Sequence, residues 1–414
     1  MQFHGCSTSK EETVLDTVLR GAALIDGTGG DVIEDSIISF RNGTITHVGT
    51  AADYKVAGHT EIYDLSGKYI IPGLIDVHIH LDLHGMADTY RENLVENKLR
   101  AIRSATEMEL TVLAGFTTVR NMGSTNYIDV AVKRAIEENL IKGPRILTSG
   151  KIICMKSAGI EYFQGMYREA DGVDENRKAA REQLKEGVDF LKVMATGAIM
   201  NPGGVPGAPQ LNTEEIRAVV EEGIKLSKYT AAHAHGAQGI KNAIRAGVRT
   251  IEHGTLADDE AIEMMVADQI YMVPTLTSNY LMLQHGEEEG VPSFMMEKAE
   301  EVSEIRVQTA KKAITAGVKI AMGTDAGTPY NYHGKNSLEM VRFVEENLMT
   351  EMEALCAATQ TAAETIGLED MIGTLKTGKT ADIVVLEKNP LTDIKCLLNG
   401  ENIYKVFKEG VLVK

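Results

Sequence analysis

Ile71-Pro-Gly-Leu-Ile-Asp-Val-His-Ile-His80 joins a Pro-Gly break, a short apolar run and two histidines spaced two residues apart. Similar short runs of apolar or β-branched residues recur from residue 72 to about residue 355, and amphipathic helical segments separate them. Alternation of this kind is typical of parallel strands that are each followed by a helix. Eight such runs can be counted, at residues 74–80, 117–121, 145–149, 190–195, 230–235, 249–253, 270–274 and 319–324.

Eight strands that alternate with helices are the number that closes a (β/α)8 barrel. The helical segments carry signals of their own: Asn212 and Glu215 have the spacing of a capping box, and an apolar face follows them. The sequence therefore predicts an α/β protein in which residues 72–366 form a catalytic TIM barrel.

Both ends of the chain carry strand and turn signals instead. Residues 36–40 and 44–48 flank Asn42-Gly43, a favoured pair for a type I′ hairpin turn. Residues 381–386 and 403–407 are two more β-rich runs. We expect the end segments, 14–71 and 367–414, to pair into one small composite β-sandwich domain.

The composition excludes several classes of protein. The 414 residues contain 42 Lys and Arg against 59 Asp and Glu, and the resulting charge of −17 repels nucleic acid. With 43% hydrophobic and 24% charged residues, the chain has a globular rather than a disordered composition. No uncharged apolar stretch has the length of a membrane span, and the first twelve residues lack the apolar region of a leader peptide.

We therefore expect a cytoplasmic protein with no nucleic-acid or membrane partner, and we expect it to form a homo-oligomer. The cysteines at positions 6, 154, 356 and 396 form no CxxC pair, so reduced thiols are expected.

Polar side chains stand where the predicted barrel strands end. In a TIM barrel the active site is built at this C-terminal face. His78 and His80 point to the same side of their strand and can hold one metal ion, although an exposed or core histidine pair has the same pattern. Four of the later strand ends carry further candidates: Lys192, His233, His235, His253 and Asp325.

Lys192 lies in the apolar run Phe190-Leu-Lys-Val-Met194, on a strand expected to be buried on both faces. An unpaired ammonium is costly there. One interpretation pairs it with a buried carboxylate such as Asp325. The other is that burial lowers its pKa and the free amine captures carbon dioxide, giving an N6-carboxylysine that bridges two divalent metal ions, expected to be zinc.

In the second interpretation, His233 and His253 complete the coordination of one ion and Asp325 that of the other. A hydroxide held between the ions attacks the substrate, and Asp325 takes its proton and passes it to the leaving group. Taken by itself, Asp325 in Gly323-Thr-Asp-Ala-Gly327 is equally a helix N-cap.

These residues, in this order, resemble the amidohydrolase superfamily, in the subtype with two metals and a carboxylated lysine. The similarity extends from Ile25-Asp-Gly-Thr-Gly29 to Gly378-Lys-Thr-Ala-Asp-Ile-Val384. Four motifs are most similar to the branch of Xaa-Pro dipeptidases and metallo-carboxypeptidases, often called imidazolonepropionase-like: Phe190-Leu-Lys-Val-Met-Ala-Thr-Gly197, Ala232-His-Ala-His-Gly236, Ile251-Glu-His-Gly254 and Gly323-Thr-Asp-Ala-Gly-Thr-Pro329.

The resemblance implies a role for each candidate. His78, His80 and Asp325 would hold one metal, His233 and His253 the other, and Lys192 would bridge them. His235 would contact the substrate carbonyl or carboxylate. Members of this branch usually carry a Gly-Gly-His stretch after the third strand, whereas this chain has Met155-Lys-Ser-Ala-Gly-Ile-Glu-Tyr162.

A dipeptide carboxylate needs a cation or a hydroxyl, and Arg120, Tyr330 and His333 are the candidates, with Arg120 equally suited to anchor the barrel wall. Lys151 and Lys156 also follow a predicted strand. The expected function is hydrolysis of a small-molecule amide, by a dipeptidase or carboxypeptidase acting on Xaa-Pro or N-acyl amino acid substrates. A hydrolase of cyclic amides is the nearest alternative, and a one-metal deaminase or a non-catalytic scaffold are more distant ones.

Overall fold

The computed structural model describes residues 16–55 and 60–414. Two predicted positions lie outside the described residues: Cys6, one of the four cysteines, and Val14, where the predicted first domain begins. The three cysteines within them, Cys154, Cys356 and Cys396, are free thiols. Among the described residues, no helix combines the length and the apolarity that a membrane span requires.

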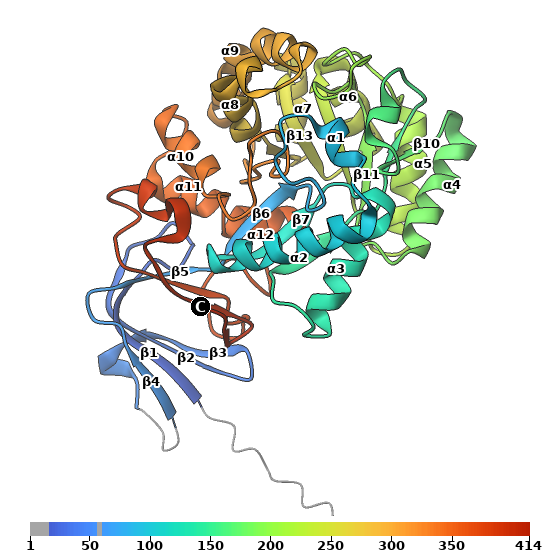
Figure 1. Cartoon of the computed structure of the whole chain (residues 1–414). Coiled ribbons are helices and arrows are strands. Elements are labelled where there is room, and N and C mark those ends of the chain that lie inside the picture. Colours follow the sequence, from blue (N-terminus) through green and yellow to red (C-terminus); the bar gives the residue numbers. More distant parts are fainter. Residues whose placement is uncertain (1–15, 56–59) are drawn as a thin grey trace, which may run out of the picture.

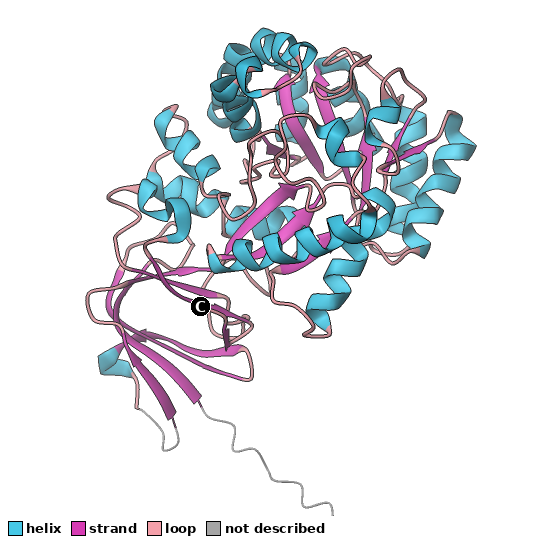
Figure 2. Cartoon of the chain, in the orientation of Figure 1, coloured by secondary structure: helices cyan, strands magenta, loops and turns pink. Residues whose placement is uncertain are grey.

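A parallel barrel surrounded by helices forms the centre of the chain (Figures 1 and 2). Seven of the eight predicted runs are regular strands, paired in parallel with their neighbours. They are β6 (Leu74–Ile79), β7 (Phe116–Asn121), β8 (Arg145–Thr148), β11 (Leu191–Met194), β12 (Thr230–Gly236), β13 (Thr250–Leu256) and β14 (Tyr271–Val273).

The eighth run, 319–324, closes the barrel without forming a regular strand. The amide of Met272 in β14 donates to the carbonyl of Lys319 at 3.0 Å, and the amide of Val77 in β6 donates to the carbonyl of Met322 at 3.0 Å. On the other side, the amide of Asp189 donates to the carbonyl of Thr148 at 2.8 Å and joins β8 to the start of β11. The ring of eight segments is therefore complete.

The helices lie outside this ring, where their apolar faces cover the strands. The predicted capping box is present: the Asn212 side chain accepts from the amide of Glu215 at 3.0 Å, and Glu215 accepts from the amide of Asn212 at 2.8 Å. The helices are α1 (Thr89–Asn93), α2 (Asn97–Leu113), α3 (Ile128–Glu137), α4 (Gly172–Lys185), α5 (Thr213–Ile224), α6 (Ala237–Ala246), α7 (Asp259–Ala267), α8 (Leu276–His285), α9 (Ser293–Ala316), α10 (Leu338–Glu345), α11 (Glu351–Ala357) and α12 (Gln360–Ile366).

An insertion follows the third barrel strand. It contains β9 (Ile152–Cys154) and β10 (Tyr167–Glu169), which pair in parallel with each other, and β9 also pairs with Val193 of β11. The segment between them carries a short 3-10 helix, Ile160–Phe163. This is the place where the sequence departs from the Gly-Gly-His pattern, and the insertion lies beside the mouth of the barrel.

The two ends of the chain pair into one sheet, as predicted. Its order is β17-β16-β15-β5-β1-β2-β3, with β4 paired to β1. Phe40 of β2 and Phe407 of β16 are separated by three strands, yet their ring centroids are 5.4 Å apart, so the sheet curls over its own apolar core. The strands are β1 (Asp16–Leu24), β2 (Ile33–Arg41), β3 (Thr44–Thr50), β4 (Thr60–Asp64), β5 (Tyr69–Pro72), β15 (Ile383–Leu386), β16 (Ile403–Lys408) and β17 (Val411–Leu412).

The turn between β2 and β3 has the predicted geometry. Asn42 and Gly43 both have positive φ, 49° and 76°, as a type I′ turn requires. The exact division of the chain into segments 14–71 plus 367–414 and a barrel of 72–366 stays a prediction.

Candidate metal centre

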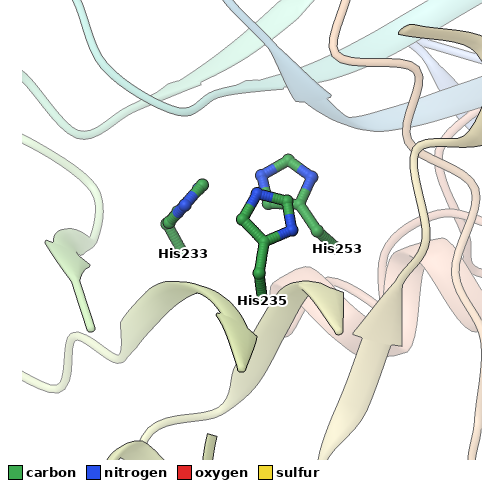
Figure 3. A group of neighbouring side chains, drawn as sticks. All are labelled: His233, His235 and His253. Atoms are coloured by element: carbon green, nitrogen blue, oxygen red, sulfur yellow. The ribbon is translucent and has the colours of Figure 1, made fainter. Parts of the chain in front are cut away.

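Three histidines from two neighbouring strands face one another at the C-terminal end of the barrel. His233 and His235 come from β12 and His253 from β13, and Figure 3 shows their rings converging. The ring centroids lie 4.6 to 4.8 Å apart. All three side chains are buried, and burial lowers their pKa values, that of His235 to about 3. They are therefore neutral at pH 7 and able to act as ligands.

A second group lies beside the first and comes from the other side of the barrel. The Oδ1 atom of Asp325 is 3.4 Å from Nε2 of His78 and 3.4 Å from Nε2 of His80. His253 joins this group as well, because a nitrogen of its ring lies within 4.8 Å of the ligand atoms of His78 and Asp325. The predicted ligands from the first, fifth, sixth and eighth barrel segments thus come together in space.

The hydrogen bonds behind two of these histidines determine which nitrogen carries the proton. Nδ1 of His78 lies 2.8 Å from a carboxylate oxygen of Glu252, and Nδ1 of His80 lies 3.2 Å from the carbonyl oxygen of Gly123. Because these oxygens only accept, each Nδ1 must donate its proton. Burial lowers the pKa of His78 to about 4, so its Nε2 carries a lone pair at pH 7.

This arrangement fits a divalent cation. Oδ1 of Asp325 is buried and accepts no hydrogen bond from the described residues, although two imidazole nitrogens face it. Lone pairs that face a carboxylate oxygen repel one another unless a positive charge lies between them. A tetrahedral ion with ligands at about 2.1 Å separates those ligands by about 3.4 Å, which matches both distances. Zinc-type coordination is therefore compatible with this donor set.

The side chain of Lys192, from β11, lines a cavity at the barrel mouth together with these histidines and Asp325. It is 2% exposed, and burial lowers its pKa to about 8. Among the described residues, no carboxylate oxygen lies within ion-pair distance of its Nζ, so the expected alternative of a salt bridge with Asp325 is not formed. An amine with this pKa is partly neutral at pH 7, and only a neutral amine can react with carbon dioxide.

Glu252 is a site residue that the sequence analysis missed. Its side chain lies between His78 and Arg120, whose Nη2 donates to it at 2.8 Å. Burial alone raises the pKa of Glu252, but the Arg120 guanidinium and the hydrogen bond from His78 lower it to about 2. Strand alternation would point Glu252 away from the side that its neighbour His253 faces. The left-handed backbone of His253, with φ of 70°, lets both side chains face the interior.

Arg120 lies deeper in the barrel than its predicted place at the substrate. It is fully buried, and its Nε donates to the carbonyl of Val77 at 2.5 Å in addition to the Glu252 ion pair. It is not among the residues that line the cavity. The geometry thus matches the alternative in which Arg120 anchors the barrel wall, because its donors are already used by protein acceptors.

Two other predicted substrate contacts also lie away from the cavity lining. The ring of Tyr330 stacks on His285, with centroids 4.0 Å apart, and its hydroxyl donates to the carbonyl of Glu289. Nε2 of His333 donates to the carbonyl of Leu83 at 3.0 Å. Both side chains hold the loops that surround the mouth.

Threonines orient two of the remaining three histidines, whereas Nε2 of the third, His233, lies 3.4 Å from the carbonyl oxygen of Gly197. Nδ1 of His235 is 2.9 Å from Oγ1 of Thr255, and Nδ1 of His253 is 2.7 Å from Oγ1 of Thr275. Each contact occupies the nitrogen that points away from the centre of the site and leaves Nε2 free for a ligand.

The cavity above the histidines is mainly apolar. One charged residue outside the predicted set, Arg306 of α9, also lines it. The apolar part of the wall consists of Leu83, Ile152, Phe163, Met166, Met194, Ala198, Ile199, Met200 and Met282, with Tyr167 beside them. Several of these residues belong to the insertion after the third barrel strand, which the sequence pattern does not predict.

Comparison with known proteins gives three results. The model of the family described as "Amidohydrolase family" matches residues 69–413. An ochratoxinase from Aspergillus niger is 31% identical over 428 aligned residues, which cover 96% of this chain and 86% of the relative. An imidazolonepropionase from Deinococcus radiodurans is 24% identical over 423 residues, covering 94% of each chain.

Solved structures give the same grouping. The crystal structure of a Xaa-Pro dipeptidase with bound methionine in its active site superposes with a TM-score of 0.89 and 32% identity, covering 96% of this chain and 99% of that one. The crystal structure of the A. niger ochratoxinase has a TM-score of 0.87 and 28% identity, covering 97% and 96%.

Proposed function

Because this chain belongs to the amidohydrolase family, we propose that it cleaves the amide bond of an N-acyl amino acid or a dipeptide, Xaa-Pro dipeptides included. The chain is a metal-dependent amidohydrolase, and its neighbours include proteins described as a Xaa-Pro dipeptidase and an ochratoxinase. The observation that carries the proposal is the convergence of His78 and His80 on the unpartnered Oδ1 of Asp325.

We propose two divalent ions, zinc by preference, at this centre. His78, His80 and Asp325 would hold one ion, and His233 and His253 the other. Lys192, whose side chain lines the same cavity, would bridge them as an N6-carboxylysine: its neutral amine would form a bond to the carbon of carbon dioxide and release one proton. The unpaired, buried ammonium and its lowered pKa support this modification.

A bound divalent ion lowers the pKa of a water molecule and polarises the substrate carbonyl. Asp325 then accepts the proton that the attacking water loses and returns it to the leaving nitrogen. Nδ1 of His235 is occupied by Thr255, so its other nitrogen is left for the substrate carbonyl or carboxylate oxygen. The apolar wall excludes bulk water from the reacting atoms and receives the acyl group or side chain of the substrate.

A substrate panel with metal-loaded protein tests this function. It contains Xaa-Pro dipeptides, N-acetylated amino acids with large apolar side chains, and five- and six-membered lactams, each assayed with and without a chelator. We expect chelator-sensitive release of free amino acid from the first two groups. Hydrolysis confined to the lactams would replace the proposal with the cyclic-amide alternative, and turnover that survives complete removal of metal would overturn it.

A further inference from the structure

Arg306 is a buried cation that reaches the active-site cavity from outside the barrel. It lies on α9 and is 3% exposed. Its Nε and Nη2 donate to the carbonyl of Pro274 at 3.2 and 2.9 Å, and Nη2 also donates to the carbonyl of Thr275 at 2.7 Å. These bonds hold one edge of the guanidinium plane against the end of β14 and fix its orientation.

The opposite edge of the guanidinium has no protein partner. Within residues 16–55 and 60–414, Nη1 of Arg306 donates no hydrogen bond, and no carboxylate lies within ion-pair distance of the group. The nearby Glu339 is used elsewhere, because it accepts from the amides of Leu276 and Thr277 at 2.7 Å each. A guanidinium keeps its charge when it is buried, so this edge requires an anion from another source.

Arg306 also lies next to the metal ligands. Its Nη2 donates to Oγ1 of Thr275, the atom that is 2.7 Å from Nδ1 of His253. In an α-amino acid amide, the carboxylate carbon is separated from the scissile carbon by only three covalent bonds, a distance of roughly 3–4 Å. A group that binds that carboxylate must therefore stand beside the metal centre, as Arg306 does.

We propose that Arg306 binds the α-carboxylate of the substrate, and that the enzyme is selective for amides whose leaving amine is an α-amino acid with a free carboxylate. This inference rests on the proposed amide hydrolysis and names the residue that recognises the leaving amino acid. Arg306 takes the role that the sequence suggested for Arg120, Tyr330 or His333. None of these three lines the cavity, and Nη2 of Arg120, the hydroxyl of Tyr330 and Nε2 of His333 are bonded to protein partners.

The site is selective because of its unpaired charge. A carboxylate makes a charge-assisted hydrogen bond to the free edge of the guanidinium, whereas a neutral carboxamide or ester leaves the buried cation uncompensated. Sites built to bond one polar group discriminate strongly against analogues that lack it. We expect the wild-type enzyme to prefer a carboxylate substrate over its carboxamide by at least about 100-fold in kcat/KM.

The first test uses the metal-loaded wild-type enzyme and three matched substrates: N-acetyl-L-methionine, its carboxamide and its methyl ester. Hydrolysis of the carboxylate alone, with inhibition by free L-methionine but not by L-methioninamide, supports the proposal. Equal turnover of the three overturns the role of Arg306 and leaves amide hydrolysis standing. No turnover of any N-acyl amino acid or dipeptide overturns the proposed function itself.

The second test compares Arg306→Met and Arg306→Lys with Lys311→Met, which removes an exposed cation from the same helix. The readout is the ratio of kcat/KM for carboxylate over carboxamide, measured together with the metal content. Damage to the metal centre lowers both rates and leaves the ratio unchanged. We expect Arg306→Met to bring the ratio near one, Arg306→Lys to retain part of it and Lys311→Met to retain all of it. An unchanged ratio in soluble, metal-loaded Arg306→Met or Arg306→Lys would overturn the proposal.

Discussion

The composite sheet and the mouth of the barrel are built on opposite principles. The sheet encloses an apolar core in which Leu19, Ile38 and Phe407 are at most 2% exposed. The mouth buries an unpartnered carboxylate oxygen, an unpaired lysine and neutral histidines. Burial is therefore a source of stability in one region, whereas in the other it is a cost that bound metal offsets.

Left-handed backbone at the mouth falls on residues that contribute to the site. His253, Thr275 and Asp325 have left-handed backbones with φ of 70°, 52° and 62°, and all three lie where barrel segments end at the site. Non-glycine residues in this region each cost of order 1–3 kcal/mol. In the hairpin of the sheet, by contrast, left-handed positions fall on Asn42 and Gly43, the residue types that tolerate them best. The sheet also has left-handed residues at Asp35 and Glu409, but only at the mouth does this backbone direct side chains toward the metal site.

Asp325→Asn is expected to have the largest effect, because it changes catalysis at the mouth without weakening the fold. The amide keeps the shape of the side chain but loses the negative charge and the ability to accept a proton. We expect kcat to fall by about 10³-fold or more, while the melting temperature of the metal-free protein stays the same or rises. Steady-state assays and thermal unfolding check this pair of results. Turnover close to that of the wild type, with metal bound, would show that Asp325 is not the proton carrier.

Phe407→Ala makes the converse change in the sheet. It removes a buried ring that packs edge-to-face on Phe40 and Tyr63. We expect a loss of about 3–5 kcal/mol in the free energy of unfolding, measured by denaturant titration, with kcat and metal content unchanged at temperatures where the variant is folded. A parallel loss of bound metal would mean that the stability of the sheet and metal binding at the mouth are coupled.

Glu252→Gln tests the hydrogen bond that orients His78. The change weakens the acceptor for Nδ1 of His78 and the partner of Arg120. We expect metal affinity to fall by about 10–100-fold, as is usual when a carboxylate behind a ligating histidine is lost. Thr255→Val is the matched control, because it removes only the contact behind His235. Competition with a chelator measures both, and equal affinities in Glu252→Gln and wild type would contradict the assignment.

The smallest effect concerns Glu92, a buried residue of the short helix α1. Burial raises the pKa of Glu92 from 4.5 to about 8. The folded protein then holds a proton that the unfolded chain releases above pH 4.5, so this contribution to stability is present below pH 4.5 and is lost as the pH rises through 8. Glu92→Gln should flatten the fall in melting temperature between pH 5 and 8 by a few degrees, and Glu109→Gln, at a partly exposed position of the neighbouring helix α2, should not. Identical pH profiles for wild type and Glu92→Gln would refute it.

The sequence predicts the barrel and its histidines for one physical reason. Parallel strands end at the same face, so His78, His233 and His253 had to meet if the strands were correctly placed. The eighth segment was located correctly as well, although it joins its neighbours by a few backbone bonds rather than a regular ladder.

What the sequence did not predict depends on local irregularity or on distance along the chain. Glu252 was missed because the left-handed backbone of His253 breaks strand alternation. The strands β9 and β10 have three residues each, too few to show a pattern. Arg306 lies within a long helix, and only the folded chain shows that it reaches the carbonyl of Pro274.

The central claim is that the donors at the barrel mouth hold metal, and metal analysis tests it most directly. Wild-type protein, Asp325→Asn and Lys192→Ala are each prepared with zinc and bicarbonate and then freed of unbound metal. Elemental mass spectrometry measures the number of metal ions that each chain retains. We predict two ions per wild-type chain and a loss of metal in both variants. Metal-free wild-type protein after this treatment, or full occupancy in both variants, would contradict the account.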